Sequence, residues 1–157
     1  MAQGRPGDRM IGQGDLIRQR LRDTLSTTVR VLDVLEAATA EELLQHAANG
    51  GAVMVLWDGS TILESKLTGT RGRTSAEVHE ETRWLTIIAV HDAGMQLESF
   101  GLEELAATIE EQLKAALLGW EIHPGQFVEQ VSAGPRPGLE PTFGLYTLAW
   151  AIRSVWP

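Results

Sequence analysis

An unbroken apolar run, Ala52–Trp57, is the feature that most restricts how this chain can fold. Gly51 precedes the run and Asp58-Gly59 follows it, and a run of this length suits a β-strand. Because every residue in it is apolar, both faces of the strand have to be covered by other elements. The sequence therefore predicts a layered fold with this strand near the centre of a sheet.

Three segments carry the signals of helices. The clearest is Leu102–Leu118, where apolar residues recur every three or four positions and Gly119 follows the last turn. A leading helix is predicted over Asp15–Leu25, with Asp15 as its cap. A short helix is predicted after Thr39, which stands three residues before Glu42 in the spacing of a capping box.

Further strands are indicated by β-branched and alternating segments. Asp58-Gly59, followed by Thr61, Ile62 and Leu63, has the pattern of a hairpin turn into a second strand. The segment Thr68–Ser75 has no large apolar residue and is predicted to be an exposed basic loop. The other predicted strands are Thr28–Leu35, Ala76–Val90, Phe127–Val131 and Gly144–Trp156, and the polar first half of Ala76–Val90 is expected to project beyond the core.

These elements predict an α/β (α+β) fold. We expect a mixed, mainly antiparallel sheet with two or three helices packed on it, and a projecting loop or hairpin. Residues 15–157 are predicted to form a single domain. Residues 1–14 are Gly-rich and lack apolar periodicity, so a flexible N-terminal arm is expected there. A chain of 157 residues can bury enough surface to be stable without a disulfide or a metal.

Composition excludes several classes of protein. The chain has no cysteine, which excludes disulfides, thiolate zinc sites and cysteine nucleophiles and favours a reducing compartment. No apolar stretch reaches the length of about 18 residues that a membrane span needs, so neither secretion nor a membrane partner is expected. The net charge of −8 disfavours general attraction to DNA, so any contact with DNA would be local or repulsive.

Motifs for catalysis and cofactor binding are incomplete. Gly12-Gln13-Gly14 lacks the third glycine and the preceding strand of a dinucleotide fingerprint, and residues 69–74 lack the ending of a phosphate loop. His79, Glu81 and His91 are conceivable metal ligands, but His79 and His91 would lie roughly 40 Å apart on a straight strand. The sequence therefore predicts a protein that is not an enzyme, with no catalytic residue, no metal and no cofactor.

Charge is segregated along the chain. Arginine and lysine residues gather in the first third and in the predicted loop, whereas the helix Leu102–Leu118 is acidic on its outer face. Either opposite patches join copies head to tail, or the two faces are unrelated and solvated. Trp57, Trp84 and Trp150 are predicted core residues. The candidate interface residues are Arg71, Arg73, Arg83, Glu103, Glu104, Glu110, Glu111 and Trp156.

The order of elements resembles the Mu-like tail protein family of tailed bacteriophages. The resemblance rests on the leading helix, the strand Ala52–Trp57, the strand with Arg83–Val90, the helix that ends in Gly119-Trp120, the Gly/Pro loop and the closing strand with Leu145–Trp150. These small virion proteins are similar in fold to tail terminators and have no active site. The resemblance covers most of the chain from Asp15 onward, and the arm lies outside it.

The resemblance implies a structural virion protein, a tail terminator or tail-completion protein. It implies a homo-oligomer, a hexameric ring, at the head-proximal end of the tail tube, with tube and sheath proteins on one side and neck or connector proteins on the other. DNA would pass through the lumen without specific binding, and the protein would lie in the virion after assembly in the host cytoplasm. The arm and the segment Thr68–Ser75 are the expected contact elements.

Two alternatives remain at this point. One is a head-completion or neck adaptor protein. The other is a small ligand-binding or hydrolase α/β domain that uses His79, His91 or the segment with Arg71 and Arg73.

Overall fold

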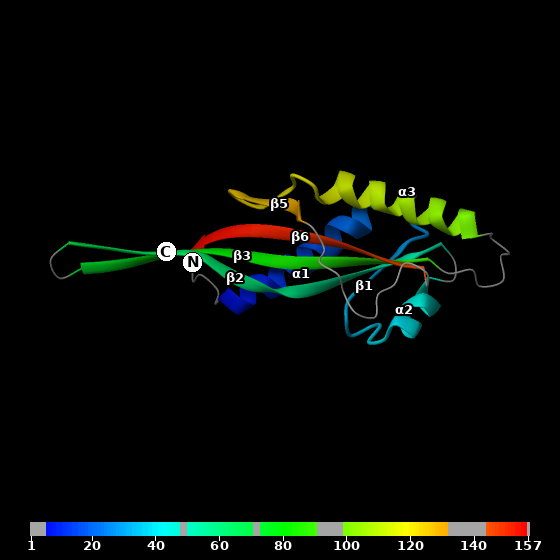
Figure 1. The fold of residues 1–157 in the computed structure, drawn as a ribbon, viewed down its shortest axis with the longest axis horizontal. Coiled ribbons are helices and arrows are strands. Elements are labelled where there is room, and N and C mark those ends of the chain that lie inside the picture. Colours follow the sequence, from blue (N-terminus) through cyan, green and yellow to red (C-terminus); the bar gives the residue numbers. More distant parts are fainter. Residues whose placement is uncertain (1–5, 48–49, 71–72, 91–98, 132–143, 157) are drawn as a thin grey trace.

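The computed structural model describes residues 6–47, 50–70, 73–90, 99–131 and 144–156. Within these residues the chain forms three helices and one six-stranded sheet, which confirms the predicted fold class (Figure 1). The strand order is β1-β2-β3-β6-β5-β4; β1 and β2 are parallel, and every other neighbouring pair is antiparallel. The elements are α1 (Pro6–Thr24), β1 (Arg30–Leu32), α2 (Ala40–His46), β2 (Ala52–Thr70), β3 (Arg73–Ala89), α3 (Ser99–Leu117), β4 (Glu121–His123), β5 (Gln126–Val131) and β6 (Leu145–Trp156).

The larger core lies between one face of the sheet and the helices α1 and α3. Apolar residues of both helices pack there against alternate residues of the central strands, which places these residues on one face. Trp150 is 1% exposed in this core, and its indole N–H donates a hydrogen bond to Thr86 Oγ1 at 2.9 Å. The largest side chains of this core include Ile17, Leu21, Ile109, Leu113, Leu117, Trp84, Ile88, Trp150 and Ile152.

A smaller core covers the opposite face under α2. Leu43 and Ala47 pack there against Met54, Ile87 and other residues of the sheet, so the strand Ala52–Trp57 is covered on both faces over its first residues, as predicted. Thr39 caps α2 by accepting a hydrogen bond from the amide of Glu42 at 3.2 Å. The predicted short helix after Thr39 is therefore confirmed.

A long hairpin of β2 and β3 replaces the predicted turn at Asp58-Gly59. That prediction is wrong, because β2 continues through these residues to Thr70. The register shifts between Trp57 and Ser60, and Gly59 has a φ of 98°, so the Asp-Gly pair forms a bulge within the strand. An Asp-Gly pair suits a bulge as well as a turn, and here the pairing of β2 with β3 beyond it decides between the two.

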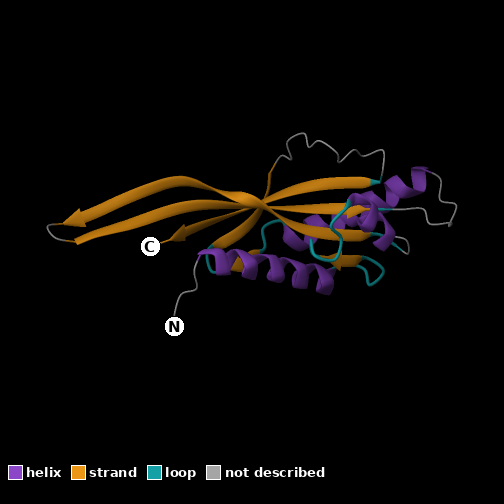
Figure 2. Ribbon diagram, turned by 90° about the horizontal axis from the view of Figure 1, so that it is seen from below, coloured by secondary structure: helices purple, strands orange, loops and turns teal. Residues whose placement is uncertain are grey.

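The hairpin projects from the body of the molecule. Figures 1 and 2 both show it extending past every helix and past the end of β6. The last residue of β6, Trp156, pairs with Val78, so residues 73–77 of β3 lie beyond the end of that strand. The predicted projection of the long strand is confirmed. The predicted loop Thr68–Ser75 is wrong as a loop, because residues 68–70 and 73–75 are paired strand ends, and residues 71–72 lie outside the described residues.

The first helix begins earlier than the sequence predicts. Residues 6–14, which were expected to belong to a flexible arm, are part of α1, so a helix start at Asp15 is wrong. Gln13 is 2% exposed, and its Oε1 accepts a hydrogen bond from Trp84 Nε1 at 3.1 Å. A Cβ atom on Gly14 would lie 2.8 Å from Trp84 Cη2, so the helix touches the sheet at this glycine. Tertiary contact, which the sequence does not display, holds this part of the helix in place.

The remaining predictions differ from the structure mainly at the ends of elements. The acidic helix is confirmed as α3, and the two closing strands are confirmed as β5 and β6. The predicted strand Thr28–Leu35 shrinks to the three residues of β1, and the short strand β4 was not predicted. The division of the chain into an arm and a single domain from residue 15 stays a prediction.

Candidate assembly surfaces

The arginines of α1 do not form the free basic patch that their spacing suggests. Arg18 pairs with the carboxylate of Asp15 at 2.6 Å on the same helix. Arg20 Nε donates a hydrogen bond to a carbonyl oxygen of α3 at 3.1 Å, and Arg22 reaches a carbonyl oxygen of β1 at 3.4 Å. Arg18 is therefore paired within α1, whereas Arg20 and Arg22 join α1 to other elements of the subunit.

The outer face of α3 is acidic, as predicted. Glu103, Glu104 and Glu111 are exposed and have no ion-pair partner within the described part of the chain. Glu110 differs from them, because its carboxylate lies 3.0 Å from the ammonium group of Lys114 one turn later. The helix therefore presents three uncompensated carboxylates to the surroundings of the subunit.

The predicted interface arginines Arg71 and Arg73 belong to the far end of the hairpin. Arg73 is the first residue of β3 and pairs with Thr70, whereas Arg71 lies outside the described residues. Lys66 lies on the other strand and pairs with Glu77. Residues 65–76 contain three basic residues and no aspartate or glutamate, but Glu64 and Glu77 flank them, so the basic stretch is confined to the end of the hairpin.

An ion-pair network marks the base of the hairpin. The carboxylate of Glu81 is 9% exposed and lies 3.2 Å from Arg83 Nε and 3.8 Å from Arg153 Nε. The side chains of Arg83 and Arg153 are 45% and 66% exposed, and an interface role for Arg83 stays a prediction. The spacing of Glu81 and Arg83 on one strand could have indicated their pairing. Arg153 could not have been found this way, because it comes from another strand, β6.

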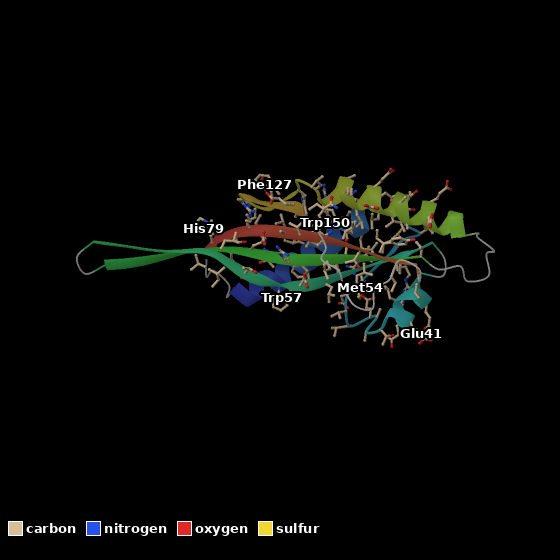
Figure 3. The ribbon with its side chains drawn as sticks, viewed as in Figure 1. Glu41, Met54, Trp57, His79, Phe127 and Trp150 are labelled. Atoms are coloured by element: carbon tan, nitrogen blue, oxygen red, sulfur yellow. The ribbon has the colours of Figure 1, made fainter. Side chains whose placement is uncertain are left out.

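Exposed apolar side chains also lie at this end of the molecule. Figure 3 places Trp57 and Phe127 toward the hairpin and Trp150 inside the body, and both of the former are 48% exposed. The prediction that Trp57 fills the core is wrong, because β1 pairs only with residues 52–54 and leaves Trp57 on the sheet edge beyond it. Trp84 and Trp150 are buried, as predicted. A contact role for Trp156, the last residue of β6, stays a prediction.

The structure has a hollow of about 560 Å³ beside the hairpin. A ligand-binding or hydrolase domain, the second alternative from the sequence, would need a site of this kind. The lining residues of the hollow are Leu63, His79, Glu80, Gly125, Arg153, Ser154 and Val155. Ser154 Oγ is buried and has no hydrogen-bond partner in the described residues, so no base there activates it as a nucleophile. Over the same residues, no three His, Asp or Glu side chains are grouped to hold a metal ion; His91 lies outside them.

The solved structures include a protein of similar fold. It is the sheath/tube terminator of PVC, an extracellular contractile injection system, seen in the extended state by cryo-EM. The TM-score is 0.56 at 14% sequence identity, and the likeness covers 99% of this chain but only 57% of that one. At this identity the comparison shows the fold alone. No curated protein matches the chain.

Family membership rests on the sequence itself. The family model described as "Phage tail terminator protein" matches residues 13–156, which is nearly the whole chain. The narrower expectation of a Mu-like protein stays a prediction. Among the helices of the described segments, none is both long and apolar enough to cross a membrane. The chain belongs to the phage tail terminator family.

Proposed function

We propose that copies of this protein form a ring that caps the head-proximal end of a phage tail tube. The match of the terminator family over residues 13–156 is the observation that carries this proposal. As a member of this family the protein is a structural component of a virion tail, and it acts by binding other proteins rather than by catalysing a reaction. It stops the growth of the tube and joins it to the neck.

A closed ring needs two different surfaces on each copy that fit one another. The chain has two different projecting or exposed features, the hairpin, whose residues 65–76 include three basic and no acidic residues, and the acidic outer face of α3. The ring has six copies, a number that the resemblance to Mu-like tail proteins suggests. The tube and the sheath bind one side of the ring, and neck or connector proteins bind the other.

The genome passes through the lumen of this ring without specific binding. The net charge of −8 supports this part of the proposal, because an acidic ring repels phosphate and does not retain DNA. The protein is made in the host cytoplasm and ends in the virion tail.

Cryo-EM of purified tails tests the proposal. Tails that carry the protein with an added fusion domain are expected to show extra density in a six-fold ring at the head-proximal end. Tubes assembled without the protein are expected to vary in length, because nothing stops their growth. Mass photometry of the ring should give about 103 kDa, six times the 17.2 kDa of one chain.

The same images distinguish the other functions. Density against the portal of heads that have no tail would identify a head-completion or neck adaptor protein. Absence of the protein from purified virions would contradict a structural role of any kind. The ring can require the tube as a template for its assembly. A protein that is monomeric in solution would therefore not contradict the proposal, and the images of tails decide.

A further inference from the structure

The turn formed by residues 33–36, between β1 and α2, holds apolar side chains in solvent. Leu35 is 90% exposed, and its neighbour Val34 is exposed as well. A single exposed apolar side chain is ordinary on a protein surface, but these two are held in a fixed position. Asp33 Oδ1 accepts hydrogen bonds from the backbone N–H groups of Leu35 at 2.9 Å and of Glu36 at 3.1 Å. Because the turn is already ordered, a partner can bind it at a low cost in conformational entropy.

The hollow beside the hairpin has room and apolar surface for these two side chains. It runs from Leu63 on β2 across β3 and β6 to Gly125, in the turn between β4 and β5. Leu63 and Val155, which line it, are each about half exposed, so apolar surface there is in contact with water. Its volume of about 560 Å³ lies within the range of pockets that enclose whole small molecules, so it can take the side chains of Val34 and Leu35.

The turn and one side of the hollow carry complementary charges. Glu36, next to Leu35 in the turn, is exposed, and so is the side chain of Arg153 at the hollow. Arg153 Nε lies 3.8 Å from the carboxylate of Glu81, which is too long for a hydrogen bond, so this contact leaves the guanidinium donors able to bind a second carboxylate. Glu80 also lines the hollow, so an acidic group of a partner has to approach from the side of Arg153.

The turn does not fill the hollow of its own subunit, because none of its residues lines the hollow. The turn follows β1, which forms one edge of the sheet, whereas Gly125 bounds the hollow near the opposite edge. Figure 3 shows the same separation. His79, which lines the hollow, lies at the base of the hairpin, and Glu41, in the helix that follows the turn, lies at the other end of the body.

We propose that the turn of one copy inserts Val34 and Leu35 into the hollow of the next copy. Glu36 of the turn then binds Arg153 at the side of the hollow. This inference rests on the proposed ring and names a contact that forms it. Because the turn and the hollow are different surfaces, each copy uses both, and the contact repeats head to tail until the ring closes. The occupant is a second copy, because the chain itself presents the apolar side chains and the carboxylate that the hollow can bind.

Cysteine crosslinking tests this contact, because the chain has no cysteine of its own. The double variants combine Val34→Cys or Leu35→Cys in the turn with Leu63→Cys or Val155→Cys in the hollow. A disulfide forms only when the two Cα atoms come within about 7 Å, so the four combinations sample the position of the turn in the hollow. Oxidation of assembled tails is expected to give a ladder of multimers with at least one combination, and reduction should return the 17.2 kDa chain.

A matched control combines Leu35→Cys with Leu118→Cys. Leu118 is also an exposed leucine, but it follows the end of α3 and does not line the hollow. This variant is expected to give no multimer larger than a dimer, because its two cysteines do not meet in the proposed contact.

Replacement of the apolar side chain provides a second test. Leu35→Asn, made in the chain without added cysteines, is expected to reduce the number of copies on purified tails at least tenfold, measured by quantitative mass spectrometry against the tube protein. Leu118→Asn is the control and should leave that number unchanged. Circular dichroism checks that both variants fold, which is expected because both leucines are exposed and asparagine suits a turn.

The outcomes separate this inference from the proposed function. A ring seen on tails without a ladder from any of the four combinations would overturn the contact and leave the ring standing. Crosslinks from the turn to the tube protein or a neck protein alone would also overturn it, as would an unchanged number of copies for Leu35→Asn. Tails without any ring density would contradict the proposed function itself.

Discussion

The hydrogen bond between Gln13 and Trp84 makes the most decisive prediction about the fold. Both side chains are at least 96% buried, and the bond of 3.1 Å ties the first half of α1 to the central strand β3. The substitution Gln13→Leu keeps the approximate size of the side chain and removes the acceptor. The buried indole N–H of Trp84 then has no partner.

The expected cost follows from that unpaired donor. Leaving a buried donor without an acceptor costs about 1–3 kcal/mol, whereas the change in packing is small for side chains of similar volume. We expect a loss of about 2 kcal/mol in the free energy of unfolding. For a chain of this length each kcal/mol corresponds to about 2–4 °C, so the melting temperature should fall by about 4–8 °C.

Urea unfolding followed by far-UV circular dichroism measures this loss. With a slope of about 2 kcal/mol per molar urea, the midpoint should fall by about 1 M. Gln19→Leu is the matched control, because Gln19 lies on the same helix, is exposed and bonds only to Asp23; it should change stability by less than about 0.5 kcal/mol. The double variant Gln13→Leu with Trp84→Phe should cost less than the sum of the single changes, because it leaves no unpaired group.

An unchanged midpoint for Gln13→Leu would refute this reasoning. It would mean that residues 6–14 do not hold α1 against the sheet, and that the flexible arm expected from the sequence describes them better.

Three further substitutions, two of them with matched controls, test packing and capping. Gly14→Ala should destabilise the protein by about 1–3 kcal/mol, because the new Cβ would lie 2.8 Å from the buried indole of Trp84. In the control Gly12→Ala the new Cβ meets nothing within 4 Å, so this change should stabilise α1 by up to about 1 kcal/mol. Equal melting temperatures of the two variants would contradict this prediction. Leu113→Ala should cost about 2–5 kcal/mol in urea unfolding and Leu118→Ala, 55% exposed, much less. Thr39→Ala should cost about 1 kcal/mol through the lost cap of α2, and no change in the urea midpoint would argue against that cap.

The candidate surfaces could be predicted from sequence only where their charges are consecutive or periodic. The acidic face of α3 was predictable, because Glu103, Glu104 and Glu111 alternate with an apolar stripe of helical period. The basic character of the hairpin was visible as well, although its shape was not. The arginines of α1 were misleading, because charge along a helix does not reveal the carbonyl oxygens that other elements bring to it.

Local sequence signals were sufficient to predict the helices α2 and α3, the apolar strand that begins at Ala52 and the closing strand β6. Capping spacing, a stripe of period 3.6 and a run of β-branched residues are properties of neighbouring residues, so they can be seen before the chain folds. These elements also determined the mixed fold class.

Tertiary structure decided whatever depended on a partner distant in the sequence. Asp58-Gly59 is a bulge and not a turn because residues 60–70 find their pairs on β3. Residues 6–14 are helical because Gln13 and Gly14 meet Trp84, and Trp57 is exposed because β1 ends before reaching it. In each case the outcome depends on contacts that exist only once the sheet has assembled, so the local sequence does not reveal it.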